Sequence, residues 1–186
     1  MGLETSRHII TKRLILVPHG LDDVDDCARM WADPAVVRMI RDTPFSYQET
    51  WSRILRYAGH WSLLGYGYWV IRNRENGRFH GELGFARTYR TLPGEAAGLP
   101  EVGCTLERTS WGRSIGQEAT LAVLRWMDDV ACIRDTAAIT DERNHAALAV
   151  LTTNGYRHCD QMDFEGKPFS VLVRRADALG VDVAPA

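Results

Sequence analysis

Residues 111–116, with the sequence WGRSIG, place two glycines and an arginine directly before a run of apolar residues at helical spacing. The first turn of a helix carries backbone N–H groups without intrahelical partners and a partial positive charge, so it can hold a phosphate or pyrophosphate. Gly112 and Gly116 leave the backbone open to a ligand, and Arg113 adds a cation that pairs with phosphate oxygens. The loop predicts a phosphate-binding site, and a tight connection that binds nothing is the alternative.

An apolar strand and an amphipathic helix must position this loop. The strand covers residues 101–106, and a polar turn covers residues 107–110. After the loop, the apolar residues that recur at helical spacing are Ala119, Leu121, Ala122, Leu124, Trp126 and Met127. The predicted order is therefore strand, turn, glycine-bearing loop and helix.

The rest of the chain alternates between strand and helix patterns. The β-rich runs predict a first strand over 9–17, a hairpin over 68–72 and 79–87, a short strand over 136–140 and a closing hairpin over 157–163 and 169–174. Helical spacing predicts helices over 21–31, about 47–62 and 144–153. This order indicates an α+β fold with one mixed, mainly antiparallel sheet flanked by helices. A single domain over residues 1–175 and a weakly ordered tail over 176–186 are expected.

Charge and hydropathy exclude several classes of partner. The 186 residues include 22 Lys and Arg against 24 Asp and Glu, which gives a formal net charge of −2 without a run of like charge. No nucleic-acid footprint is therefore expected. No stretch approaches the ~20 apolar residues of a membrane span, and the N-terminus lacks an apolar leader. The prediction is a cytoplasmic protein without a nucleic-acid or membrane partner.

The four cysteines are Cys27, Cys104, Cys132 and Cys159. They form no C-x-x-C pair, and no histidine lies at metal-ligand spacing from any of them. The spacing predicts neither a metal site nor a disulfide framework.

Residues 99–127 as a whole resemble the acetyl-CoA-binding segment of the GCN5-related N-acetyltransferase (GNAT) superfamily. The RimJ/RimL-like branch often has the loop pattern Trp-Gly-x-Gly-x-Ala-x-Glu-Ala, and residues 111–119 fall in register with it. Ser114 departs from the pattern, because the family usually has glycine there. The resemblance implies that the CoA pyrophosphate is held by Trp111, Gly112, Arg113, Ser114, Ile115 and Gly116.

A second segment supports the same family. Asn144-His145-Ala146-Ala147, followed by Gly155-Tyr156, resembles the family's Asn-x-x-Ser…Gly-Phe segment, which implies that the Asn144 side chain helps to hold the pantetheine arm. Residues 11–16, TKRLIL, resemble the T-x-R-L-x-L start of the RimJ/RimL-like sheet. The resemblance implies the GNAT fold along nearly the whole chain, acetyl-CoA as co-substrate, an amine as acceptor and no metal. A homodimer is left open.

Acetyl transfer from a thioester to an amine requires the neutral amine, since an ammonium has no lone pair. About 0.04% of lysine side chains and about 14% of α-amines are neutral at pH 7. The resemblance places the start of the central strand beside the thioester, so Glu101 is the first candidate for the general base, acting directly or through water. Glu82, on the neighbouring strand, is the second candidate. A solvated carboxylate at a strand end is the alternative for both.

The tetrahedral intermediate needs hydrogen-bond donors aimed at its oxygen. Backbone N–H groups near Cys104, Thr105 and Leu106 would supply them if the central strand splays from its neighbour there. A buried, unreactive thiol is the expected state of Cys104. Aromatic residues are dense between residues 45 and 69 and would suit an acceptor pocket, although core packing is the expected role of each taken singly.

The departing CoA thiolate lacks an obvious proton donor. Relatives use a tyrosine or a serine on the last helix, and this chain has Leu151 and Ala147 at those positions. Tyr156 or a water molecule is left as the replacement. The preferred hypothesis is an acetyl-CoA-dependent N-acetyltransferase that acts on a protein N-terminus or a small amine. A non-catalytic acyl-CoA-binding or regulatory module on the same fold is the alternative.

Overall fold

The computed structural model describes residues 7–164 and 166–175, so the tail predicted from residue 176 lies outside the described part of the chain. The strands are β1 (Ile9–Ile10), β2 (Leu14–Pro18), β3 (Tyr68–Asn73), β4 (Phe79–Ala86), β5 (Glu101–Leu106), β6 (Thr136–Asp141), β7 (Arg157–Phe164) and β8 (Lys167–Arg174). The helices are α1 (Val24–Trp31), α2 (Pro34–Val37), α3 (Tyr47–Leu64), α4 (Ile115–Asp129) and α5 (His145–Thr153). Short 3₁₀ turns cover Leu21–Asp23, Gly94–Ala96 and Arg108–Ser110.

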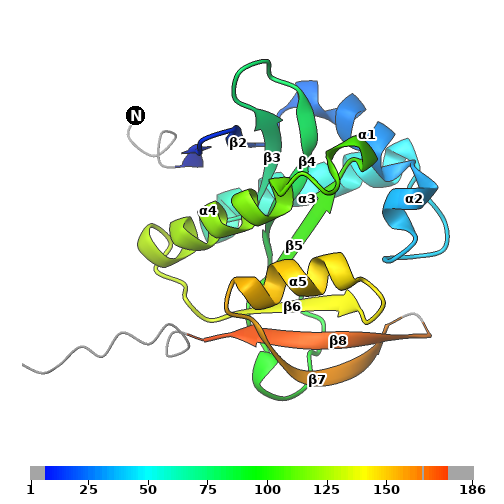
Figure 1. Ribbon diagram of the computed structural model, residues 1–186, viewed down its shortest axis with the longest axis vertical. Helices are drawn as coiled ribbons and strands as arrows, with labels where there is room; N and C mark the ends of the chain where they lie inside the picture. The colour runs from blue at the N-terminus through cyan, green and yellow to red at the C-terminus, as the bar shows by residue number, and fades with distance from the viewer. Residues whose placement is uncertain (1–6, 165, 176–186) are drawn as a thin grey trace, which may run out of the picture.

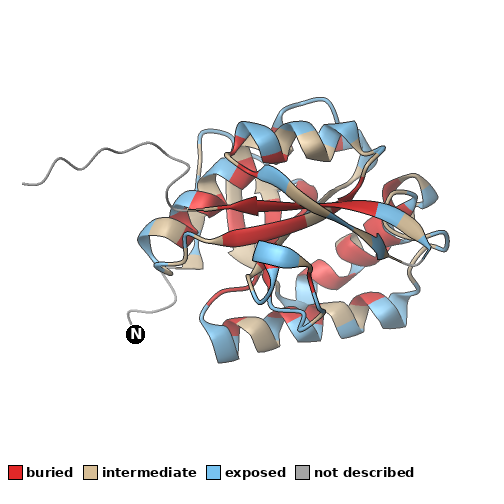
Figure 2. Cartoon of the chain, turned by 90° about the horizontal axis from the view of Figure 1, so that it is seen from below, coloured by how far each residue is buried: buried red, intermediate tan, exposed pale blue. Residues whose placement is uncertain are grey.

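One eight-stranded sheet, in the order β1-β2-β3-β4-β5-β6-β8-β7, forms the middle of the molecule. Neighbouring strands are antiparallel except for β5 and β6, which are parallel. Helices α4 and α5 cover one face, and α1 and α3 cover the other (Figure 1). The strands are largely buried and the helices expose their outer sides (Figure 2). This is the α+β architecture that the sequence predicts.

Alternating side chains of the central strands build a core on each face. Trp69 and Ile71 of β3 belong to the larger core under α4, and Val70 between them belongs to the core under α1 and α3. Neighbouring residues of a strand point to opposite faces, so the continuous apolar run of β3 fits a strand covered on both sides.

Local sequence sets both ends of α3. The Ser46 hydroxyl accepts a hydrogen bond from the Glu49 N–H at 3.2 Å, and the Glu49 carboxylate accepts one from the Ser46 N–H at 2.8 Å. This reciprocal capping box satisfies two of the free amides at the helix start. Gly65 ends the helix with a left-handed backbone, at φ 75°. The helix therefore extends two residues past its predicted end.

The single strand predicted over residues 9–17 is wrong. β1 and β2 instead form a small antiparallel hairpin in which Ile9 lies opposite Leu16. The turn between them is held from outside, because the Thr11 hydroxyl and the Arg13 N–H both donate to the Glu118 carboxylate of α4, at 2.6 and 3.0 Å. Within the turn, the Thr11 N–H also donates to the Leu14 carbonyl at 2.9 Å, so local bonds and the contacts to Glu118 together hold residues 11–13 outside the strands.

The sheet opens between β5 and β6. These strands pair only at Glu101 with Ala137 and at Val102 with Ala138, whereas β5 stays paired with β4 as far as Leu106. From Gly103 onward, β5 therefore has no partner on its β6 side. We call this opening the β5–β6 slot.

No helix of the described residues combines the length and the apolar character that crossing a membrane requires.

Candidate active site

The loop before α4 has two residues with a left-handed backbone, Gly112 and Ser114. Gly112 has φ 67° and Ser114 has φ 58°, so both lie in the left-handed region. Glycine adopts this region without a steric penalty, and serine does not. The position at which the resembling family usually has glycine therefore requires a left-handed backbone. Trp111 ties the loop to the end of β5, because its indole N–H donates to the Leu106 carbonyl at 2.9 Å.

Arg13 holds the loop from the side of the β1–β2 turn. Its two terminal nitrogens donate to the carbonyls of Arg113 and Ser114, at 3.0 and 3.3 Å. Its Nε donates to the Glu118 carboxylate at 2.6 Å. The TKRL motif and the loop motif therefore meet in one cluster, which we call the Arg13–Glu118 clamp.

The clamp orients the amides of the loop. In a planar trans peptide, C=O and the following N–H point in opposite directions, so the carbonyls bound by Arg13 turn the N–H groups of Ser114 and Ile115 away from it. Within the described residues, the N–H groups of Ser114, Ile115 and Gly116 have no acceptor. Free amides at a helix start, beside the exposed Arg113 side chain, suit a phosphate or pyrophosphate.

The β5–β6 slot lies next to this loop. A Cβ built on Gly116 would lie 3.5 Å from Leu106 Cδ1 and 3.9 Å from Cys104 Sγ, so the first turn of α4 faces these β5 side chains. Cys104 is exposed, which corrects the expectation of a buried thiol. Desolvation by the surrounding protein atoms and the Glu82 carboxylate raise the pKa of Cys104 to about 12. The thiol is therefore protonated at neutral pH and is not a nucleophile.

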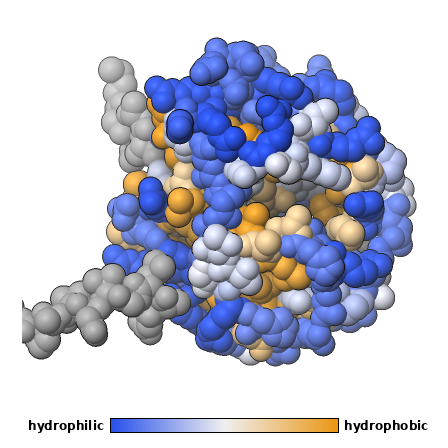
Figure 3. Space-filling model, in the orientation of Figure 1, coloured by the Kyte–Doolittle hydropathy of each residue, from blue (hydrophilic) through white to orange (hydrophobic). Residues whose placement is uncertain are grey.

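The far side of the slot carries α5. Asn144 caps this helix, since its side-chain oxygen accepts a hydrogen bond from the Ala147 N–H at 3.2 Å. Apolar residues gather across the middle of the face that carries α4 and α5 (Figure 3). Leu151 is buried in the core. The predicted role of Asn144 in holding pantetheine stays a prediction.

Tyr156 is not a candidate proton donor for the slot. Its hydroxyl shares a hydrogen bond of 2.7 Å with Thr136 Oγ1, and both residues are buried. The suggestion that Tyr156 replaces the missing acid is therefore wrong.

Glu101 is a buried and paired carboxylate. Arg90 Nε lies 3.2 Å from one of its oxygens, and the Thr88 hydroxyl donates to the other. The alternative of a solvated carboxylate is wrong. Glu101 is the first residue of β5 and forms the first of the two pairs with β6, two residues before the β5–β6 slot opens at Gly103.

Glu82 is more deeply enclosed. The Tyr57 hydroxyl donates to one oxygen at 2.5 Å, and His19 Nε2 lies 3.3 Å from the other. Burial alone raises the pKa of Glu82, but the hydrogen bonds and charges of His19, Arg53 and Tyr57 outweigh it and lower the pKa. Glu82 is 1% exposed, so an acceptor amine cannot reach it without moving Tyr57.

Cys27 joins this network. The donor atoms of His19, Cys27 and Glu82 lie within 4.8 Å of one another, a set of types that can hold a metal. Burial and the Glu82 carboxylate raise the pKa of the Cys27 thiol far above its usual range. His19 Nε2 and the Cys27 thiol both approach the Glu82 carboxylate, so the three residues form one buried polar network. No sequence pattern indicates this network, because its members come from three distant segments.

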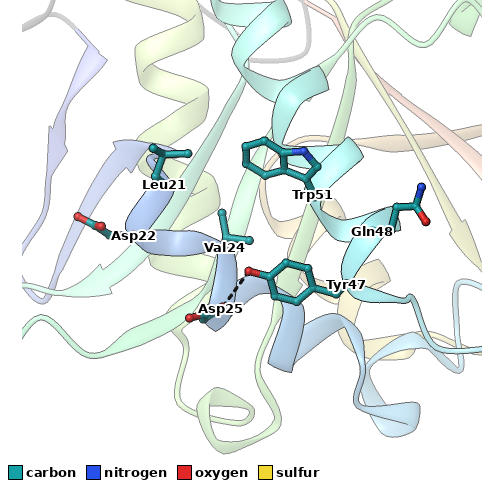
Figure 4. Close-up of a pocket in the computed structure, with 7 residues that line it drawn as sticks. All are labelled: Leu21, Asp22, Val24, Asp25, Tyr47, Gln48 and Trp51. Atoms are coloured by element: carbon teal, nitrogen blue, oxygen red, sulfur yellow. Dashed lines mark hydrogen bonds between the residues drawn. The ribbon is translucent and has the colours of Figure 1, made fainter.

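A cavity of about 860 Å³ lies apart from these groups, between the starts of α1 and α3 (Figure 4). It is lined by Leu21, Asp22, Val24, Asp25, Tyr47, Gln48 and Trp51. The Tyr47 hydroxyl donates to Asp25 at 2.9 Å across it. Tyr47 and Trp51 belong to the aromatic segment 45–69 that would suit an acceptor pocket, whereas none of the predicted catalytic or CoA-binding residues lines this cavity.

Comparison with known proteins identifies a family. The family model described as "Acetyltransferase (GNAT) domain" matches residues 13–157. The uncharacterized N-acetyltransferase p20 of Bacillus licheniformis is 28% identical over 112 residues, which is 60% of this chain and 60% of that protein. The match therefore spans less than two thirds of this relative.

Solved structures show the same fold. An acetyltransferase from Agrobacterium tumefaciens superposes with a TM-score of 0.76 at 20% identity, covering 90% of this chain and 94% of that one. RimL, a ribosomal L7/L12 alpha-N-protein acetyltransferase solved in complex with coenzyme A, has a TM-score of 0.75 at 18% identity, covering 92% of this chain and 99% of that one. Ribosomal-protein-S5-alanine acetyltransferase from Vibrio fischeri has a TM-score of 0.74 at 13% identity, covering 91% and 97%.

Proposed function

The chain belongs to the GNAT acetyltransferase family, and on that premise we propose that it transfers the acetyl group of acetyl-CoA to a primary amine. The observation that carries the proposal is the loop before α4. Its free amides at Ser114, Ile115 and Gly116 are held open by the Arg13–Glu118 clamp, directly beside the β5–β6 slot.

The described residues fit acetyl-CoA. The free amides and Arg113 would hold the pyrophosphate, and Asn144 would lie beside the pantetheine arm on the far side of the slot. The unpaired edge of β5 beyond Val102 would offer backbone groups to the arm and the acetyl end. Bound acetyl-CoA supplies an acetyl group activated as a thioester.

The acceptor amine enters from the other face of the sheet. The loop and Cys104 lie on the α4 face, whereas Glu101 and Glu82 lie on the face of α1 and α3. Glu101 is the proposed base, because it lies on β5, the strand that lines the slot, whereas Glu82 lies on β4 and is enclosed behind Tyr57. It accepts the amine proton directly or through water. Along β5, alternate backbone N–H groups face β4, so those of Cys104 and Leu106, and not that of Thr105, face the slot and stabilise the developing oxyanion.

Two relatives support one class of acceptor. They are named ribosomal L7/L12 alpha-N-protein acetyltransferase and ribosomal-protein-S5-alanine acetyltransferase, so the α-amine of a protein N-terminus is the acceptor to be tested first. Small primary amines form the second class.

The test measures free thiol released from acetyl-CoA in the presence of N-terminal peptides and small amines. Amine-dependent release above the rate without amine is expected. The second candidate is a non-catalytic acyl-CoA-binding module, which the absence of a proton donor at Ala147, Leu151 and Tyr156 favours. Acetyl-CoA binding by calorimetry without release for any amine would support this candidate and contradict catalysis.

A further inference from the structure

The side chain of Tyr68, the first residue of β3, extends over a glycine on each of the next two strands. It is opposite Gly84 of β4, and Gly84 is opposite Gly103 of β5. A Cβ built on Gly84 would lie 2.8 Å from Tyr68 Cγ, and one built on Gly103 would lie 2.2 Å from the Tyr68 hydroxyl oxygen. Real Cβ atoms do not approach this closely, so the two glycines give the ring and its hydroxyl their place on the sheet.

The ring is fixed from its other side as well. Tyr57 stacks on it with ring centroids 4.2 Å apart and planes 7° from parallel. Tyr57 is itself fixed by its hydrogen bond to Glu82. The Tyr68 carbonyl accepts a hydrogen bond from the Trp61 indole N–H at 2.9 Å. Locked neighbours of this kind hold a functional group within a narrow range of positions.

The hydroxyl lies at the edge of the β5–β6 slot. Gly103 is the first residue of β5 beyond the last pair with β6. Because side chains alternate along a strand, Gly103 shares its face with Glu101 and Thr105, and Thr105 lies opposite Glu82. The hydroxyl is therefore on the acceptor face, between the rows that carry the two carboxylates. No described residue forms a hydrogen bond with it.

The protonation state of the Tyr68 hydroxyl limits its possible role in the reaction. Burial, followed by the charges of Glu82 and Glu101, raises the pKa of Tyr68 well above its usual value of 10.0. The phenol therefore keeps its proton at neutral pH and cannot serve as the general base. It remains both a hydrogen-bond donor and an acceptor.

We propose that the Tyr68 hydroxyl is a further catalytic residue, which binds the acceptor amine at the edge of the slot. This inference rests on the proposed acetyl transfer. An N–H of the neutral amine donates to the phenol oxygen, which leaves the nitrogen lone pair free to face the thioester carbonyl. The nitrogen then bonds to the acetyl carbon, the C–S bond breaks and sulfur keeps its electron pair. The amine proton goes to Glu101 or to water, and Tyr68 keeps its own proton.

Tyr68→Phe tests the proposal, because phenylalanine keeps the stacked ring and removes only the hydroxyl. With an amine that the parent acetylates, kcat/KM for the amine should fall about 10- to 100-fold, through a raised KM, as the loss of one polar contact to a substrate predicts. KM for acetyl-CoA and the melting temperature should stay near the parent values. The matched control is Tyr66→Phe, which removes a buried tyrosine hydroxyl in the main core.

Gly103→Ala gives an independent test, because the new methyl group would occupy the place of the Tyr68 oxygen. Gly103→Ala should lower kcat/KM for the amine as much as Tyr68→Phe does. The double variant Tyr68→Phe with Gly103→Ala should have a kcat/KM no lower than either single variant. A kcat/KM for the amine that stays at the parent value in Tyr68→Phe would overturn the proposal. An equal fall of kcat/KM in Tyr66→Phe would also overturn it, as would a fall in the double variant equal to the product of the two single falls. If the parent binds acetyl-CoA but acetylates no amine, the proposed function itself fails.

Discussion

Glu101 and Glu82 have the same side chain on the same face of the sheet, but their surroundings give them different capacities. Glu101 is the proposed base on the strand that lines the slot, and Glu101→Gln removes its basic oxygen while it keeps the size of the side chain. Turnover should fall by about 10²–10⁴ with little change in acetyl-CoA affinity. The deficit should shrink as the pH approaches the pKa of the amine, because neutral amine is then supplied without a base. Initial rates from pH 6 to 10 check this.

Glu82→Gln should affect stability more than deprotonation. The variant keeps an acceptor for Tyr57 but loses the charge that faces His19, so the free energy of unfolding should fall by about 2 kcal/mol at pH 7. The pKa of Glu82 is lowered in the folded protein, so its contribution is complete above about 4.5, its unfolded value, and is lost as the pH falls through the folded value. Urea unfolding at pH 7, 5 and 4 measures the difference in free energy of unfolding between the parent and Glu82→Gln. This difference should become smaller only below the unfolded pKa. A difference that stays constant down to pH 4 would contradict the charged network.

Ser114 is the residue that the left-handed loop tolerates least. Ser114→Gly keeps the backbone at φ 58° without the Cβ clash, so it should raise the free energy of unfolding by about 1 kcal/mol. For a domain of this size the melting temperature would rise by about 2–4 °C. Ser114→Ala keeps the clash and serves as the control. An equal rise in both variants would mean that the serine hydroxyl, rather than backbone strain, is unfavourable.

The surroundings of single residues were only partly predictable from the sequence. The departure at Ser114 is visible by resemblance, but its reason is a φ angle that no local pattern reports. The pairing of Glu101 with Arg90 and the enclosure of Glu82 depend on segments that are far apart in the chain. Tyr68 was one aromatic among many, and the two glycines that single it out can be linked to it only once the strand register is known.

At the scale of elements, the Arg13–Glu118 clamp joins the β1–β2 turn to the start of α4. Arg13→Met should release the carbonyls of Arg113 and Ser114 and allow the loop amides to turn. Acetyl-CoA affinity should fall about 10-fold, which corresponds to about 1.4 kcal/mol. Isothermal titration calorimetry measures the change.

The control for the clamp is Lys12→Met, which removes the charge of an exposed neighbour that has no described ion pair. Its effect on affinity should stay below twofold. If both variants lose affinity equally, long-range attraction for the phosphates, and not the clamp, explains the result.

Elements with a strong local pattern were predicted well. The central strand 101–106 matches β5, and the helix predicted over 144–153 matches α5 to one residue. The first strand failed because the bonds from Thr11 and Arg13 to Glu118 cross more than 100 residues of sequence. The short helix α2 is not among the predicted helices, and Asp33 caps it by accepting a hydrogen bond from the Ala35 N–H at 2.9 Å. Local periodicity does not report either contact.

At the scale of the whole molecule, the β5–β6 slot divides the sheet into two parts. One part contains β1 to β5 with the loop and α4, and the other contains β6, β7 and β8 with α5. Within the sheet, only two residue pairs join them. A ligand held by the loop on one side and by Asn144 on the other would therefore connect the two parts.

Acetyl-CoA binding should stabilise the whole protein and should protect the junction most. At a hundredfold excess over Kd, a ligand that binds only the folded state adds about 2.7 kcal/mol, which raises the melting temperature of a domain of this size by about 5–10 °C. Hydrogen exchange should slow in β5, β6 and the first turn of α5, and less in β1 and β2. Arg113→Ala should reduce both effects at the same ligand concentration, because it removes a contact to phosphate. Protection confined to the α4 side, with unchanged exchange in β6 and α5, would mean that the ligand does not span the slot, and the role predicted for Asn144 would then be wrong.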